Sequence, residues 1–77
     1  MDLTAIGLNI IKRRKSLNLT QDDISERTGI TQPNVCKLEN GLNSNPSVNT
    51  LQRIADALGC DLLYLLETES GSDLLNS

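Results

Sequence analysis

Gly29 separates two short helical patterns within the stretch from Thr20 to Gly41, and this arrangement constrains the fold more than any other feature of the chain. Glycine enters the left-handed backbone region at little steric cost, so it is expected where one helix stops and another starts at once. The pattern predicts a helix over about residues 21–28 and another over about 31–40. A tight turn must therefore join the two helices.

The starts of both helices carry typical end signals. The Thr20 hydroxyl can cap the first helix, and Asp23 completes the spacing of a capping box. Thr31 is expected to cap the second helix, whose first turn contains Pro33 at a place where proline's missing N–H has no partner to lose.

Helical periodicity then assigns an inner and an outer face. The few large hydrophobic residues of this stretch must meet on one side, namely Ile24, Ile30, Val35 and Leu38. The same spacing leaves a hydrogen-bonding face outside, made of Gln32, Pro33, Asn34 and Lys37. A two-helix hairpin in any helical bundle would show this periodicity, so the pattern alone does not identify a function.

The chain length allows one small domain. With 77 residues a single core is only marginally stable, and self-association often helps such chains. Tyr64 is the only aromatic residue, so the core must consist of Leu, Ile and Val, which suits an all-α bundle of short helices. We expect the domain to cover residues 1–67, followed by a flexible acidic tail over 68–77.

The residue types give no support to catalysis or metal binding. The chain has no histidine, and no nucleophile has a suitable base beside it, so we expect neither an enzyme nor a cofactor. Cys36 and Cys60 lack C-x-x-C spacing; we expect two buried thiols in a reducing cytosol rather than a disulfide or a redox switch. Because no stretch suits a membrane span or a signal peptide, we expect a cytoplasmic protein without membrane contact.

The net charge of −3 is unfavourable for a nucleic-acid partner, but the charges are unevenly distributed. Residues 1–53 hold all seven basic side chains and five acidic ones, which gives +2, whereas residues 54–77 hold five acidic side chains and no base, which gives −5. Such a molecule can turn its basic end toward DNA, with weak non-specific binding.

Three further helices are expected around the central pair. The first begins after Asp2 or Thr4 and reaches about Ser16, with Leu3, Ile6, Ile10 and Ile11 in its buried stripe. Turn-forming residues predict a loop over 42–47, after which Ser47 or Asn49 caps a helix that ends at Gly59. Asp61 then caps a short helix over residues 62–67.

The last helix is apolar all round, although covering one side of a small core requires only one stripe. Leu62, Leu65 and Leu66 can cover the core, which leaves Leu63 and Tyr64 as an exposed apolar patch. We expect this patch to be the interface of a homodimer, since self-association often helps a domain with such a small core. The alternative is that the end of the chain folds back over the patch.

The amino-acid sequence from about Ile6 to Leu66 resembles the Cro/repressor-type helix-turn-helix family, also called the Xre family. The resemblance is carried by Thr20-Gln21, Gly29-Ile30-Thr31-Gln32 and Leu38-Glu39-Asn40-Gly41. It implies a five-helix, lambda-repressor-like DNA-binding domain whose second central helix enters the major groove. In that family Gln32 occupies the leading base-reading position, and its amide can bind adenine N6 and N7.

The remaining roles follow from the same resemblance. Lys37 is expected to reach guanine and Asn34 a base or a phosphate, while Pro33 replaces a polar reader and offers apolar contact, such as to a thymine methyl. Contacts to the DNA backbone are expected from Gln21, Thr31, Asn40, Asn43, Arg13 and Lys12. For Lys12 a purely solvated role is as acceptable. Arg14, which continues the buried stripe of the first helix, is expected to form a structural ion pair with Glu39.

Three functions fit these features. The leading one is a small dimeric transcriptional regulator that binds an inverted-repeat operator in double-stranded DNA, such as a Cro-like phage repressor or the controller of a restriction–modification system. The second is an antitoxin of the HipB/HigA type, which binds a toxin protein as well as its own operator. The third is a fold kept only for protein interaction, which would be indifferent to changes at Gln32 and Lys37.

Overall fold

The computed structural model describes residues 2–43 and 46–67, and the described chain is helical, without a strand. Its helices are α1 (Leu3–Ser16), α2 (Gln21–Thr28), α3 (Gln32–Glu39), α4 (Val48–Leu58) and α5 (Leu62–Leu66). The expected all-α class and the five helices are therefore confirmed. The expected tail over 68–77 lies outside the described residues.

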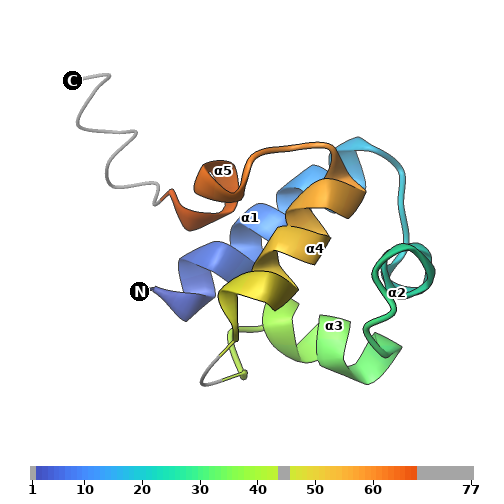
Figure 1. Ribbon diagram of the computed structural model, residues 1–77, viewed down its shortest axis with the longest axis horizontal. Coiled ribbons are helices and arrows are strands. Elements are labelled where there is room, and N and C mark those ends of the chain that lie inside the picture. The colour runs from blue at the N-terminus through green and yellow to red at the C-terminus, as the bar shows by residue number, and fades with distance from the viewer. Residues whose placement is uncertain (1, 44–45, 68–77) are drawn as a thin grey trace.

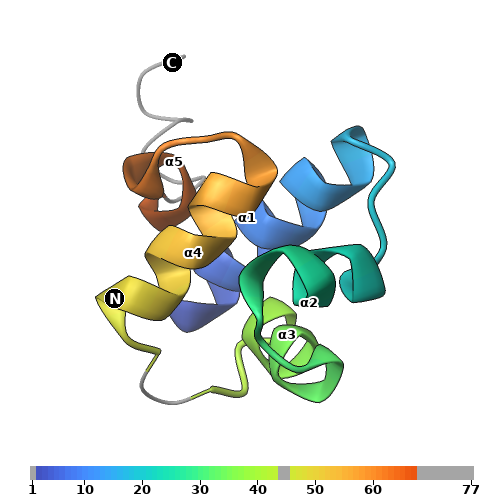
Figure 2. The same cartoon turned by 45° about the vertical axis from the view of Figure 1, so that its right-hand side comes forward.

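The helices form two groups around α1 (Figure 1). α2 and α3 lie at one end, where α3 packs against both α1 and α2, and Figure 2 shows the two helices side by side. α4 runs along α1 through the middle of the molecule, and α5 packs against α1 and α4 on the side away from α3. This arrangement leaves one long side of α3 uncovered.

The core is aliphatic, as the composition predicts. Its buried side chains come from all five helices, namely Ile6, Ile10, Ile24, Val35, Leu38, Leu51, Ile54, Ala55, Leu58 and Leu65. Ile30 packs against this core and remains partly exposed. Tyr64, the one aromatic residue, stays outside the core.

Most helix ends use the residues that the sequence indicates. Thr20 and Asp23 form a reciprocal capping box, with the Thr20 N–H 2.8 Å from Asp23 Oδ2 and the Asp23 N–H 3.0 Å from Thr20 Oγ1. Gly29 ends α2 at a φ of 77°, in the left-handed region. Asp2 caps α1 and Ser47 caps α4 through side-chain hydrogen bonds.

Two expected caps differ in their chemistry. Thr31 and Asp61 occupy the N-cap positions of α3 and α5, but neither side chain accepts a capping hydrogen bond. In α3, Pro33 lies in the first turn and has no N–H to donate, which reduces the number of donors that a cap could satisfy.

Candidate nucleic-acid interface

The uncovered side of α3 carries polar side chains on a rigid element. Gln32, Pro33, Asn34 and Lys37 are all exposed. Val35 and Leu38 point into the core, and this fixes the rotation of α3 about its axis. The four expected base-reading residues therefore share the solvent-facing side of one helix.

A buried ion pair holds the far end of α3 against α1. Arg14 Nε lies 2.7 Å from Glu39 Oε2, and Arg14 Nη2 lies 2.9 Å from Glu39 Oε1, so the contact is bidentate. The side chains retain only 13% and 2% exposure. The hydrogen bond to Glu39 raises the pKa of Arg14 further above its usual value. Arg14 also donates from Nη1 to Leu19 O at 3.0 Å, which ties the turn before α2 to the same group.

Two glutamines extend this pair to the surface. Gln21 Nε2 donates to Glu39 Oε1 at 3.0 Å, and Gln32 Nε2 donates to Gln21 Oε1 at 2.6 Å. We call the connected side chains of Arg14, Glu39, Gln21 and Gln32 the polar relay. It runs from the interior of the molecule to the first residue of α3.

The carboxylate fixes the direction of every hydrogen bond in the polar relay. An ionised Glu39 can only accept, so the Gln21 amide must turn its NH₂ group inward and its oxygen toward Gln32. Gln32 then donates one N–H to Gln21, and its second N–H and its oxygen can bind a ligand. In the major groove adenine presents an acceptor, N7, beside a donor, N6–H. The remaining N–H and oxygen of Gln32 are complementary to these two groups.

The expected backbone-contacting residues occupy varied positions. Gln21 opens α2 and Thr31 directly precedes α3, where Thr31 is exposed. Asn43 lies partly buried in the loop after α3. The Asn40 amide turns back on its own helix and donates to Cys36 O at 2.9 Å.

Arg13, of which a phosphate contact is expected, donates hydrogen bonds to the end of α4. Its Nε donates to Leu58 O at 3.0 Å and its Nη2 to Gly59 O at 3.4 Å. The last carbonyls of a helix lack partners within the helix and attract cations, so the guanidinium caps the end of α4. Arg13 therefore joins α1 to α4, whereas its neighbour Lys12 has an exposed side chain on α1.

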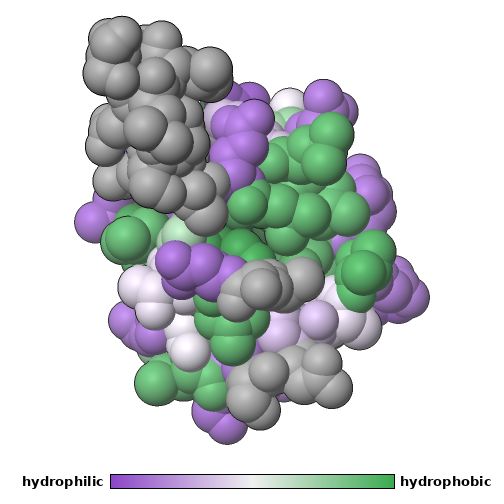
Figure 3. Space-filling model, turned by 90° about the vertical axis from the view of Figure 1, so that its left-hand side faces the viewer, coloured by the Kyte–Doolittle hydropathy of each residue, from purple (hydrophilic) through white to green (hydrophobic). Residues whose placement is uncertain are grey.

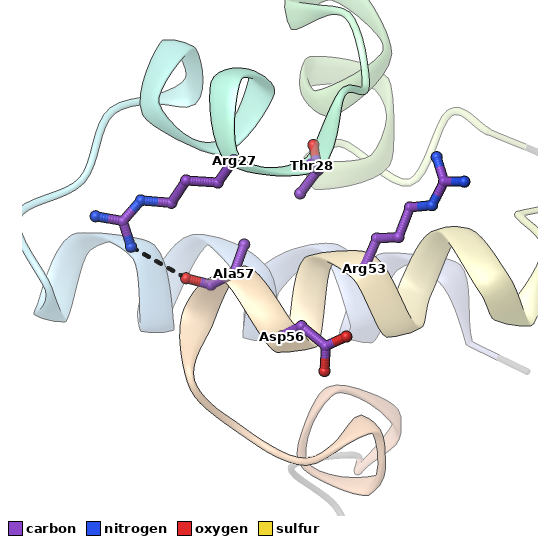
Figure 4. A pocket seen from close by; sticks show the side chains of 5 residues that line it. All are labelled: Arg27, Thr28, Arg53, Asp56 and Ala57. Atoms are coloured by element: carbon purple, nitrogen blue, oxygen red, sulfur yellow. Dashed lines mark hydrogen bonds between the residues drawn. The ribbon is translucent and has the colours of Figure 1, made fainter.

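A shallow groove of about 460 Å³ lies between α2 and α4, lined by Arg27, Thr28, Arg53, Asp56 and Ala57. Figure 4 shows that the two guanidinium groups point in opposite directions along the groove. Arg27 donates from Nη1 to Ala57 O at 3.3 Å, so part of its charge serves the contact between the helices. The two arginines do not converge on a common anion-binding point.

The cysteines remain free thiols. Cys36 and Cys60 are each partly buried, and burial raises the pKa of the Cys60 thiol. Within residues 2–43 and 46–67, no three side chains of the metal-binding types gather into a site. In the same part of the chain, every helix is too short or too polar to span a lipid bilayer.

The last helix exposes the apolar side chains that the sequence indicates. Leu65 is fully buried, whereas Leu63 and Tyr64 keep 72% and 43% of their surface exposed. Figure 3 shows hydrophobic side chains gathered on the side of the molecule that carries α5 and the first turns of α1 and α4. We call Leu63 and Tyr64 the α5 patch.

Several known proteins are similar to this chain in sequence or in fold. A transcriptional regulator of the helix-turn-helix type from Sinorhizobium fredii is 39% identical over 61 residues, which cover 79% of this chain and 78% of the relative. The antitoxin HigA1 of Mycobacterium tuberculosis is 40% identical over 58 residues, which cover 75% of this chain but 38% of the antitoxin. The crystal structure of the restriction–modification controller protein C.AhdI from Aeromonas hydrophila superposes with a TM-score of 0.79 at 25% identity, covering 83% of this chain and 96% of the controller.

The helix-turn-helix family matches residues 10–65, which include the end of α1, the whole of α2 to α4 and most of α5. The matched region contains the polar relay and the exposed side of α3. The chain therefore belongs to the helix-turn-helix family of DNA-binding transcriptional regulators, of the Cro or Xre type.

Proposed function

We propose that the protein binds an inverted-repeat operator as a homodimer and regulates transcription there, in the manner of a Cro-like repressor or a restriction–modification controller. The observation that carries this proposal is the polar relay, which fixes the amide of Gln32 at the start of a helix whose outer side is uncovered. A side chain held in one orientation loses little freedom on binding and so discriminates well between bases.

Base recognition is assigned to the outer face of α3. Gln32 binds adenine through N6 and N7, and Lys37, one turn further along, binds O6 or N7 of guanine. Pro33 packs against a thymine methyl group, and Asn34 reaches a base edge or a phosphate. All four side chains are exposed and lie on α3 or at its first residue, so one insertion of the helix can bring them to adjacent base pairs.

Backbone contacts set the position of the protein on the duplex. We assign them to Gln21 with the first amides of α2, to Thr31, to Asn40 at the end of α3, and to Asn43 in the loop that follows. Lys12 supplies a cation on α1. Arg13 is left out of this group because its guanidinium caps α4.

Weak dependence on salt is expected for this interface. The chain carries a net charge of −3, and Arg14 is neutralised by Glu39. The protein therefore neutralises few phosphates on binding and releases few counterions. The dependence of the binding constant on salt concentration should correspond to only about two or three released counterions per protomer. Affinity then depends on hydrogen bonds to bases more than on charge.

The dimer is assigned to the α5 patch. Burial of Leu63 and Tyr64 against a second copy removes apolar surface from water, and a two-fold arrangement presents two α3 helices to the DNA. We place the DNA-binding domain in residues 1–67.

The experiment that tests the function is selection of bound duplexes from a random pool by the purified protein at near-physiological salt. The expected result is an inverted repeat whose half-site centres lie about 34 Å apart, one turn of the double helix. An enriched site without inverted symmetry would contradict the homodimer, and no enrichment would contradict specific binding by the protein alone.

A second function, that of an antitoxin, is favoured by the 40% identity to HigA1, although this chain covers 38% of that protein. In this case the protein binds a toxin as well as its operator. A toxin that co-purifies at a fixed ratio with the untagged protein would support it, and purification of the untagged protein from its native host without a second polypeptide would contradict it.

A further inference from the structure

Asn9 on α1 grips the C-terminal end of α5 through its side-chain amide. Its Nδ2 atom lies 2.6 Å from Glu67 O, 3.0 Å from Leu65 O and 3.4 Å from Tyr64 O. These partners are all acceptors, so the NH₂ group of the amide must face α5. One polar side chain therefore contacts three carbonyls more than fifty residues away in sequence.

α5 needs such support because it is short. It has five residues, and a helix of this length is not stable by itself in water. The last carbonyls of any helix lack partners within the helix, and at the other end the Asp61 side chain makes no capping hydrogen bond. Among residues 2–43 and 46–67, α5 is also held by the burial of Leu65 and the partial burial of its neighbours Leu62 and Leu66.

The hydrogen bonds of the Asn9 side chain lie directly beside the α5 patch. Tyr64 belongs to the patch and presents its carbonyl to Asn9, and Leu63 precedes it in the same turn. Any rotation or unwinding of α5 that broke the contacts of Asn9 would also turn Leu63 and Tyr64. The direction in which the patch faces is thus linked to a residue on another helix.

We propose that Asn9 is a positioning residue for the dimer surface: it holds α5 in the rotation that presents Leu63 and Tyr64 to a second copy of this chain. This inference rests on the proposed homodimer. Asn9 itself stays on α1 and need not contact the partner.

The test uses two variants of Asn9. Asn9→Asp keeps the size of the side chain but replaces its NH₂ donor by a charged acceptor, and Asn9→Ala removes the whole amide group. Sedimentation equilibrium gives the dimer dissociation constant, and amide hydrogen exchange reports the opening of each helix. We expect a dissociation constant raised about tenfold or more by Asn9→Asp, with faster exchange confined to α5. Asn49→Ala changes an exposed asparagine of α4 and should alter neither quantity.

Leu63→Glu separates failure of the inference from failure of the proposed dimer. If Leu63→Glu dissociates the dimer while both Asn9 variants keep the wild-type constant, the positioning role is overturned and the dimer surface stands. If Leu63→Glu has no effect, the assignment of the dimer to the α5 patch is wrong. Faster exchange spread equally over all helices of the Asn9 variants would show a general loss of stability and would also overturn the positioning role.

Discussion

Two regions of the molecule are held by different kinds of interaction. Where α2 and α3 meet α1, the polar relay connects the helices through directional hydrogen bonds. Where α4 closes over α1, the buried contacts are aliphatic, from Leu51, Ile54 and Leu58, and the hydrogen bonds of Arg13 add to them only at the end of α4. Hydrophobic contacts stabilise without fixing orientation, whereas a bidentate ion pair and its hydrogen bonds fix single atoms. The region that must orient one amide is thus the one in which polar side chains connect the helices, in addition to the buried Val35 and Leu38.

Removal of Arg14 should have the largest effect on stability. Arg14→Ala leaves the nearly buried Glu39 carboxylate without its cation, and we expect the free energy of unfolding to fall by about 3 kcal/mol. Chemical denaturation followed by circular dichroism measures this change. Lys15→Ala, next to it on the same helix and exposed, is the control and should change stability little. Equal stability of the two variants would mean that the pair does not hold α3.

The close approach of α1 to α3 should give the next largest effect. A side-chain carbon at Gly7 would overlap the backbone carbonyls of Leu38 and Glu39. Gly7→Ala should therefore destabilise the protein by about 2 kcal/mol, although alanine is the better helix former. Thermal unfolding checks the sign of the change. A more stable variant would show that α1 and α3 can separate without loss and would weaken the account of the polar relay.

Shortening the polar relay at Gln21 should affect DNA recognition more than folding. Gln21→Ala removes the bond that fixes Gln32, and preference for adenine in the bound half-site should fall by about 1 kcal/mol. Competition binding with base-substituted duplexes measures this preference. Gln52→Ala on α4 is a matched control, since Gln52 is exposed and bonds only within its own helix. An unchanged preference in Gln21→Ala would remove Gln21 from the account.

The capping box of α2 should give the smallest effect, visible as a pH dependence. Hydrogen bonds, first from the backbone N–H of Thr20, lower the pKa of Asp23 below its usual value. The stabilisation is present above the pKa that Asp23 has in the unfolded chain and is lost as the pH falls through its lower pKa in the folded protein. Asp23→Asn should flatten this part of the stability profile. An identical acid limb in both proteins would contradict the assignment.

Much of the fold could be predicted because its signals are local. Thr20, Gly29, Ser47 and Gly59 fix helix ends through their own backbone or side-chain chemistry, and helical periodicity assigns Val35 and Leu38 to the core. The outer face of α3 follows from those inner residues by geometry alone. The spacing of Ile6 and Ile10 predicts that Arg14 points partly inward, whereas its partner Glu39 follows from the family resemblance.

Contacts between distant polar side chains could not be predicted in this way. Gln21 links Glu39 to Gln32, Arg13 caps α4, and Asn9 grips α5. Each contact depends on how two helices pack, and no local pattern marks an asparagine or arginine whose partner lies on another helix. The only sequence signal for Asn9 is its polar side chain next to the buried Ile10 of α1.

The most direct test of the account is a cycle of binding constants for wild-type protein and Gln32→Ala on the selected operator and on operators changed one base pair at a time. We predict that Gln32→Ala loses about 1–3 kcal/mol on the operator and becomes indifferent to one A·T pair in each half-site, while the other positions keep their preferences. If Gln32→Ala instead loses the same affinity on every duplex, Gln32 does not read a base, and the polar relay serves only the stability of the fold.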